Sequence, residues 1–347
     1  MSLLRTLYRG ENHFDFIEGS RKVLMASAVI VLISIIALLG RGLNLGIEFE
    51  GGVVWEVPAG EASEDDIRST LTEFGLEGRI QKVTGGTDVF RVRAESATIA
   101  QQDDLTAALA ETVGVTVNDI SRSEVGPSWG KEITDKARTA LIWFFILLAL
   151  YITFRFEWKM AAAALIAVAH DILISVGVYA LFQFEVTPAT VIAFLTIMGY
   201  SLYDTIVVFD RVKETSRAAE KARTRYTDVV NVSLNQVAMR SVNTSITSGL
   251  PVLSMLVIGR FVLGAVALQE FAVALLVGIL AGTYSSIFVA APILVALKLR
   301  EPEWARRREL ARKSGEVGSV AEAATTLAAG SYSRTAPPRP RKKGKKR

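Results

Sequence analysis

The sequence predicts an α-helical multi-spanning membrane protein with six transmembrane helices and one small α+β domain outside the bilayer. Half of its 347 residues are hydrophobic, 21% are charged, and the apolar residues gather into long runs. A bilayer requires about 17 to 25 mostly apolar residues for each spanning helix. The predicted spans are 23–40, 138–154, 160–182, 187–209, 241–259 and 271–297. Gly278 and Gly282, four residues apart in the last span, favour close helix contact.

Positive charge predicts which connections face the cytoplasm, because Lys and Arg are retained on that side of the membrane. With six spans, the basic connections and both basic ends of the chain fall on one side. The basic residues are Arg5, Arg9, Arg21, Lys22, Arg155, Lys159, seven Lys or Arg from Arg211 to Arg240, and fifteen after residue 297. Residues 1–22 and 298–347 are therefore expected in the cytoplasm. No small-residue cleavage motif follows the first span, so we expect an uncleaved anchor.

Residues 41–137 form the large segment expected outside the membrane. Its pattern predicts strands at 51–57, 79–83, 89–93 and 115–120 and helices at 63–74 and 102–112. Ser63 with Asp66 three residues later is a helix N-cap pattern, and Gly85 with Gly86 marks a turn. The order β-α-β-β-α-β is that of a ferredoxin-like domain. Its acidic surface fits either a docking face or a plain solvated surface.

Two further segments lie on the expected cytoplasmic side. Residues 210–240 mix charges with apolar residues near Val229 and Leu234, which suits an amphipathic helix at the inner membrane surface. Residues 298–347 are rich in Ala, Ser, Pro, Lys and Arg and end in PPRPRKKGKKR, so we expect a basic disordered tail. Contact of this tail with anionic lipid or ribosomal RNA is one hypothesis, and a solvated extension is the other.

Two acidic residues lie inside predicted spans, where a charged side chain costs about 2.5 to 3.5 kcal/mol on insertion scales. Asp171 follows His170 in the third span, and Asp204 lies in the fourth, within GYSLYD. Acidic residues in spans usually face a bundle interior or a water path. His170 and Asp171 suit either proton transfer or hydrogen bonding between helices, because histidine titrates near neutral pH but neighbouring helical residues point about 100° apart.

Asp204 is the stronger candidate for proton handling. Tyr200 and Ser201 precede it by about one turn and share its polar stripe on an otherwise apolar helix. A buried carboxylate can take up and release a proton. The expected basic counterpart is Arg240, at the start of the fifth span. The alternatives are a static ion pair between Asp204 and Arg240, or an Asp204 too near the inner membrane surface to take part.

Other kinds of chemistry find no support in the sequence. It contains no cysteine, P-loop, HExxH or GxSxG motif, so it indicates neither a thiolate metal site nor an ATPase or hydrolase. We therefore expect no enzymatic activity, no cofactor and no metal. Any work must draw on a partner or an ion gradient, and moving one charge across 100 mV supplies about 2.3 kcal/mol.

Four ordered motifs resemble those of the SecF proteins in the SecD/SecF family, which belongs to the resistance-nodulation-division superfamily. The motifs are LNLGIEFEGG, AHDILISVG, GYSLYDTIVVFDRVKE and MRSVNTSITSGLPVL. The resemblance implies a subunit of the Sec translocase in the bacterial cytoplasmic membrane. Such a subunit works with SecD and uses the proton-motive force to promote late steps of export after SecA-driven translocation. The implied partners are SecD, the SecYEG translocon, SecA, YajC, translocating preproteins and membrane lipids, with no specific nucleic acid.

The resemblance also assigns residues, since Asp204 and Arg240 match positions implicated in proton transport. The other motif residues are Gly46, Glu48, Gly51, Gly52, Gly199, Tyr200, Ser201, Asp210, Arg211, Asn243 and Thr244. Tyr203 stands where the family usually has Asn, and Glu48 where it usually has Asp. Two rival functions stay open. A small-molecule or lipid exporter of the same superfamily would need homodimerisation or another partner, and a scaffold would stabilise the translocon without transport.

Overall fold

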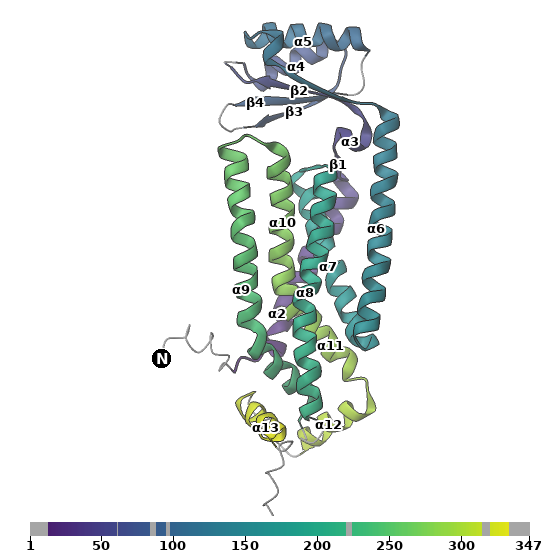
Figure 1. The fold of residues 1–347 in the computed structure, drawn as a ribbon, viewed down its shortest axis with the longest axis vertical. Helices are drawn as coiled ribbons and strands as arrows, with labels where there is room; N and C mark the ends of the chain where they lie inside the picture. The colour runs from purple at the N-terminus through teal and green to yellow at the C-terminus, as the bar shows by residue number, and fades with distance from the viewer. Residues whose placement is uncertain are drawn as a thin grey trace, which may run out of the picture.

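The computed structural model describes residues 13–60, 62–83, 88–94, 98–219, 224–313 and 320–332. Figure 1 shows a bundle of long helices with an α+β domain at one end and two short helices at the other. Arg5, Arg9, the turn at Gly85 and Gly86, and the PPRPRKKGKKR terminus lie outside the described residues.

Six helices of the described chain are long and apolar enough to cross a membrane, as predicted. They are α2 (Phe16–Arg41), α6 (Pro127–Arg155), α7 (Trp158–Phe182), α8 (Pro188–Ala219), α9 (Tyr226–Phe261) and α10 (Val266–Ser285), which continues through a π-helical segment (Ser286–Ala290) into α11 (Ala291–Lys298). The apolar stretches of α7, α8 and α10 are 56%, 44% and 56% buried, whereas those of α2, α6 and α9 are 17%, 11% and 11% buried. Helices α7, α8 and α10 are therefore central.

The predicted amphipathic helix over 210–240 is not a separate element. Residues 210–219 end α8 and residues 226–240 begin α9, which continues without a break to Phe261. The apolar side chains that suggested a membrane-surface helix, including Val229 and Leu234, are fully buried against neighbouring helices. Packing inside the protein therefore accounts for their amphipathic pattern.

The α+β domain contains β2 (Gly52–Pro58), α4 (Glu64–Glu73), β3 (Gly78–Val83), β4 (Val89–Ala94), α5 (Ile99–Val113) and β5 (Ser121–Val125). The strand order is β3-β4-β2-β5, and every neighbouring pair is antiparallel. Helices α4 and α5 cover the face of the sheet that points away from the bundle (Figure 1). Ser63 and Asp66 form the predicted capping box of α4.

Side chains of β4 alternate between the two faces of this sheet, as they do in any strand. Phe90 and Val92 are buried in the core shared with α4 and α5. Trp55 of β2 lies in the same core, where its indole N–H donates to the Thr106 hydroxyl at 2.9 Å. The intervening residues Arg91 and Arg93 therefore point from the opposite face toward the helix bundle.

The predicted strand at 115–120 is wrong in position. Residues 117–119 form a 3₁₀ turn, because the Asp119 carboxylate accepts hydrogen bonds from the Thr116 hydroxyl at 2.7 Å and amide at 2.9 Å. The strand is β5, at Ser121–Val125, and most of its side chains are exposed. Its sequence shows no alternation of apolar residues, because backbone hydrogen bonds to β2, rather than buried side chains, fix its position.

Two short strands were not predicted. β1 (Asn44–Leu45) pairs in parallel with β6 (Glu185–Val186), which lies between α7 and α8. The short helix α3 (Ile47–Glu50) follows β1 and leads into the sheet. These elements join the base of the α+β domain to the ends of the central helices.

The expectation of disorder throughout the tail is wrong for its described part. α12 (Pro302–Lys313) and α13 (Val320–Tyr332) are helical. The Trp304 ring packs edge-on to Tyr226 of α9, with ring centroids 4.9 Å apart. Ala323 and Leu327 of α13 pack in a buried cluster with Val229. Apolar residues spaced among the charges thus attach these helices to α9.

Candidate functional site

The two acidic residues predicted within spans are both buried among the central helices. Asp171 lies on α7 with 1% of its surface exposed, and Asp204 lies on α8 with 5% exposed. Burial of an ionised carboxylate is tolerated only when hydrogen bonds or opposite charges compensate for lost hydration. The partners of each carboxylate therefore define the site.

Asp204 is held by two serine hydroxyls from different helices. Ser241 of α9 donates to Oδ1 at 2.7 Å, and Ser286 donates to Oδ2 at 2.6 Å. Hydrogen bonds to an ionised acceptor are each worth about 1.5 to 3 kcal/mol. Asp204 thus connects α8, α9 and the segment that follows α10.

Arg240 does not form an ion pair with Asp204 in this structure, so the alternative of a static ion pair between them is wrong. Its guanidinium donates to the Tyr203 hydroxyl at 2.9 Å and lies 6.0 Å from the centre of that ring. Arg240 and Tyr203 are both exposed, on the side of α8 and α9 that no other described helix covers. Tyr203, which stands where the family usually has Asn, therefore has a structural consequence. Its hydroxyl binds the Arg240 guanidinium at the position next to Asp204 in the sequence, rather than at the Asp204 carboxylate.

Asp171 has a larger set of partners. Its Oδ2 accepts from the hydroxyls of Ser201 and Ser285, the latter at 2.7 Å, and its Oδ1 lies 2.8 Å from His170 Nδ1. His170 Nε2 lies 2.5 Å from the Ser27 hydroxyl and 3.1 Å from a tyrosine hydroxyl on α10. With a proton on Nδ1, the ring donates to the Asp171 carboxylate, whose ionised oxygens only accept. His170 and Asp171 therefore belong to one network that joins α2, α7, α8 and α10.

Adjacent serines connect the two carboxylates. Ser285 ends α10 and donates to Asp171, and Ser286 begins the π-helical segment and donates to Asp204. Neighbouring residues of a helix point in different directions, so two consecutive serines can donate hydrogen bonds to α7 and to α8. Single π-helical turns within helices are frequent at functional sites. Sequence reasoning missed this pair, although two consecutive serines within an apolar span were a usable signal.

Small residues bring α10 close to α8 beside this site. A Cβ atom on Gly278 would overlap the side chain of Ile197, and one on Gly282 would lie 3.0 Å from the Cβ of Ser201. The predicted close approach at Gly278 and Gly282 is confirmed, and its partner is α8. This contact holds Ser201 and the serine pair near one another.

The glycine-rich motif lies at the base of the α+β domain, far along the chain from the carboxylates. Gly51 and Gly52 have φ values of 80° and 126°, and a Cβ on Gly52 would lie 2.7 Å from the carbonyl oxygen of Ala94. The Gly46 amide donates to a carbonyl of β6 at 2.8 Å. Glu48 is half-buried, and its Oε2 has no partner among the described residues. This motif shapes the junction between domain and bundle.

The remaining motif residues lie on α8 and α9. Asp210 bonds Arg155 at 2.8 Å, and Arg211 donates to Gln236 at 2.6 Å, so both stabilise the end of α8 that lies near α12 and α13. Gly199 and Asn243 are exposed, and Tyr200 and Thr244 are partly exposed. None of these four contacts either buried carboxylate within the described residues.

The arrangement suits reversible protonation of a carboxylate. In the described part of the chain, no group of three or more His, Cys, Asp or Glu side chains is placed to hold a metal ion. Hydroxyl groups can donate to an ionised carboxylate and accept from a protonated one, because they rotate. Proton uptake at Asp204 would therefore reorganise contacts with α9 and with the segment after α10.

Two family comparisons agree with this division of the chain. Residues 105–300 match the family described as protein export membrane protein SecD/SecF, C-terminal, and residues 36–62 match the SecD/SecF GG motif. The chain belongs to the SecD/SecF family. Both buried carboxylates fall within the first SecD/SecF match, and the glycine pair at the domain junction falls within the second.

Sequence comparison with individual SecD/SecF proteins shows how much of each of them this chain covers. It is 39% identical over 331 residues to protein translocase subunit SecF of Streptomyces coelicolor, across 94% of this chain and 88% of that protein. It is 34% identical over 294 residues to protein translocase subunit SecDF of Thermus thermophilus, across 83% of this chain and 39% of that protein. It therefore corresponds to less than half of the SecDF polypeptide.

A solved SecD/SecF structure has a similar fold. The crystal structure of SecDF from Thermus thermophilus, described as a translocon-associated membrane protein, matches with a TM-score of 0.76 and 34% identity. The match covers 86% of this chain and 40% of that chain. With its six apolar helices, this SecD/SecF chain is a multi-pass membrane protein.

Proposed function

We propose that this protein is a SecF-type subunit of the Sec protein translocase. It works with SecD and uses the proton-motive force to promote late steps of protein export, after SecA has driven a preprotein into the SecYEG channel. The observation that carries the proposal is the pair of buried carboxylates, Asp171 and Asp204, joined by adjacent serines at the centre of the bundle. YajC and membrane lipids are further expected contacts.

Asp204 is the proposed proton-binding group, and Arg240 is its proposed counter-charge. When Asp204 is ionised, both of its oxygens accept from serine hydroxyls. Protonation turns one oxygen into a donor, and the serine hydroxyl beside it can rotate to accept that proton. In the present arrangement Arg240 is retained by Tyr203. We infer that its attraction to an ionised Asp204 competes with this contact, so that protonation changes how α8 and α9 are held together.

SecD is the proposed partner because a polar surface lies exposed at the depth of the spans. Tyr203 and Arg240 lie on it, and Asn243 and Thr247 extend it along α9. Exposed polar side chains on spanning helices are costly in lipid and usually face a protein partner or water. Proteins named SecDF carry both parts in one polypeptide, and this chain covers 39% of one of them.

The proposed setting is the bacterial cytoplasmic membrane, with both termini in the cytoplasm and a ferredoxin-like domain outside. The basic residues around α12, including Arg306 and Arg308, lie at the end of the bundle opposite the sheet (Figure 1). Positive charge favours the cytoplasmic side. The sheet would then face the side on which exported chains emerge.

The test is export of a model preprotein into sealed vesicles that contain SecYEG, SecA, SecD and this chain. We expect a proton gradient to increase export with the wild type and to have no effect with Asp204→Asn. Asp210→Asn is the matched control, because Asp210 lies on the same helix but pairs with Arg155 at the surface. Equal gradient-dependent gains in Asp204→Asn and wild type, at equal abundance, would refute the proposed role of Asp204.

The same vesicles separate the rival functions. A scaffold predicts that Asp204→Asn lowers the amount of assembled translocase rather than its response to the gradient, which co-purification with SecYEG measures. An exporter of small molecules or lipids predicts assembly without SecD, so recovery of a homodimer instead of a SecD complex would favour it.

A further inference from the structure

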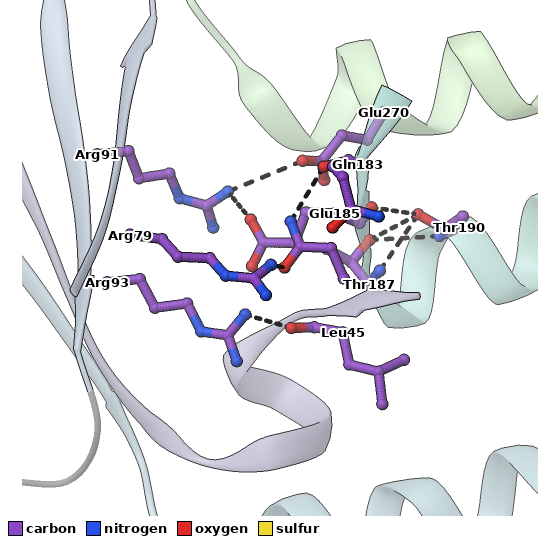
Figure 2. A network of polar contacts seen from close by, with 10 residues as sticks. Leu45, Arg79, Arg91, Arg93, Gln183, Glu185, Thr187, Thr190 and Glu270 are labelled. Carbon is purple, nitrogen blue, oxygen red and sulfur yellow. Dashed lines mark hydrogen bonds and ion pairs between the residues drawn. The ribbon is translucent and has the colours of Figure 1, made fainter. Parts of the chain in front are cut away.

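The face of the sheet that points toward the bundle is lined by arginines. Arg79 of β3 and Arg91 and Arg93 of β4 extend side by side toward the ends of the central helices (Figure 2). Arg93 bonds the carbonyl oxygen of Leu45 and the carboxylate of Glu50. These contacts attach the sheet to β1 and α3, which precede it in the chain.

Arg91 makes a different kind of contact, because it reaches the helices themselves. Its Nη1 donates to Glu185 Oε2 at 2.7 Å and lies 3.9 Å from Glu270 Oε1. The side chains of Arg91, Glu185 and Glu270 are 14%, 8% and 5% exposed. An ion pair this deeply buried is not screened by solvent as a surface pair is, so removing one partner is costly.

The positions of the two glutamates link this contact to the carboxylate site. Glu185 lies three residues before α8, the helix that carries Asp204. Glu270 lies in the second turn of α10, the helix that leads to Ser286. The Arg91 side chain therefore contacts β6, which leads into α8, and α10, which leads into the segment that carries Ser286.

The ion pair of Arg91 with Glu185 lies among more buried carboxylates than it can neutralise. Glu185 Oε1, Glu270 Oε2 and Glu48 Oε2 are buried without hydrogen-bond partners among the described residues. Burial raises the pKa of Glu185 above its ordinary value, against the opposing effects of Arg91 and Arg93. Other charged or titratable groups that face the cluster are Glu50, Arg79 and Tyr179, whose hydroxyl donates to the Glu270 carbonyl at 2.6 Å. Protons from the side on which the sheet lies can therefore reduce the charge that holds Arg91.

We propose that Arg91 is a positioning residue that holds the α+β domain against β6 and α10 while Glu185 and Glu270 are ionised, and releases it when they are protonated. A change in the spacing of α8 and α10 at the Asp204 site then also changes the docking of the domain. The docking contact follows from the geometry alone, whereas its use in export rests on the proposed function.

The experiment measures the position of the domain in the full-length chain. The natural sequence has no cysteine, so Ala107→Cys on α5 and Ile258→Cys on α9, both exposed, place two spin labels specifically. Electron–electron distances are recorded in lipid nanodiscs at a series of pH values from about pH 8 down to about pH 4, the region of an ordinary glutamate pKa. For the wild type we expect a single label-to-label distance at the higher pH. As the pH falls, we expect a growing fraction of molecules to show a second, longer distance.

Variants at the contact give the sharper comparison. Arg91→Gln should increase the ratio of undocked to docked domain at least about tenfold at the higher pH and remove most of its pH dependence. Arg91→Lys should restore part of the docked population, and Glu185→Gln should resemble the wild type at low pH. Arg122→Gln is the matched control, because Arg122 is an exposed arginine of the same sheet, paired with Asp103.

Failure of this proposal can be told apart from failure of the proposed function. If Arg91→Gln and Glu185→Gln, both monodisperse, keep the wild-type distances and pH dependence, Arg91 does not position the domain. If the distances change as expected but export in vesicles shows no response to the gradient, the docking contact stands and the proposed function is wrong.

Discussion

Gly278 offers a test of the close contact between α8 and α10, which keeps the serine donors of α10 and the following segment near Asp171 and Asp204. In Gly278→Ala, the added methyl group overlaps the side chain of Ile197. Ile197 is 2% exposed, so it has no free space into which it can move. Relief of the overlap requires α8 and α10 to separate or Ile197 to leave its preferred rotamer.

The magnitude follows from comparison with a glycine in open surroundings. Overpacking in a filled interior costs about 1 to 3 kcal/mol. At Gly249 of α9 nothing lies within 4 Å of the added Cβ, so Gly249→Ala gains up to about 1 kcal/mol from helix propensity. The gain from helix propensity is common to both substitutions, so Gly278→Ala should be less stable than Gly249→Ala by the overpacking cost, about 1 to 3 kcal/mol in the free energy of unfolding.

The assay is unfolding in mixed micelles followed by circular dichroism. We expect Gly278→Ala to unfold more easily than the wild type, and Gly249→Ala to be equal to it or more stable. In the double variant Ile197→Ala with Gly278→Ala, the new methyl group fills part of the space left by the isoleucine, so the two effects should sum to less than their separate costs, with a coupling of about 0.5 to 3 kcal/mol. Strict additivity, or equal stability of both Gly→Ala variants, would refute the close contact.

Three further predictions concern the site and the α+β domain. His170→Leu should lower the free energy of unfolding by about 1 to 3 kcal/mol, measured in the same micelles, because Asp171 Oδ1 loses its buried partner. Tyr203→Phe should increase the mobility of Arg240, seen as faster motion of its guanidinium in NMR relaxation, because the hydroxyl acceptor is lost and the ring is kept. Hydrogen bonds from the Ser63 amide and hydroxyl hold the pKa of Asp66 below its ordinary value of 3.8, so their stabilisation of α4 is present above that value and lost as the pH falls through the lower folded-state pKa. Hydrogen exchange of the first turn of α4, corrected for the intrinsic rate, should therefore accelerate at that acidic pH in the wild type and already be fast near neutral pH in Asp66→Ala.

Elements with a strong local signal could be predicted from the sequence. The six spans follow from the length of their apolar runs, and the helix that begins after Ser63 follows from its N-cap pattern and helical spacing. β5 and the pair β1 and β6 have no such signal, since backbone hydrogen bonds to distant segments place them and their side chains carry no alternation. The tail helices were missed because charge composition outweighed a few apolar contacts, such as Trp304 on Tyr226.

The candidate site divides in a similar way. Asp171 and Asp204 stand out in the sequence because an acid in an apolar run is rare. Their partners do not, because serine is common in spans and nothing in the order of residues shows that Ser285 faces α7 while Ser286 faces α8. The alternative of a static ion pair with Arg240 does not hold, because two serine hydroxyls bond the Asp204 carboxylate instead.

The difference between the two carboxylates indicates which of them is suited to exchange protons. Asp171 has three partners, including the His170 ring, and any change in its charge must rearrange a network that reaches four helices. Asp204 has two hydroxyl partners that can reverse their hydrogen bonds by rotation alone, and it adjoins the exposed Tyr203. Rotation of a hydroxyl is less costly than reorganising a buried network, since no buried group need lose its partner. Asp171 therefore suits a fixed role in helix association, and Asp204 suits a role in which its charge alternates.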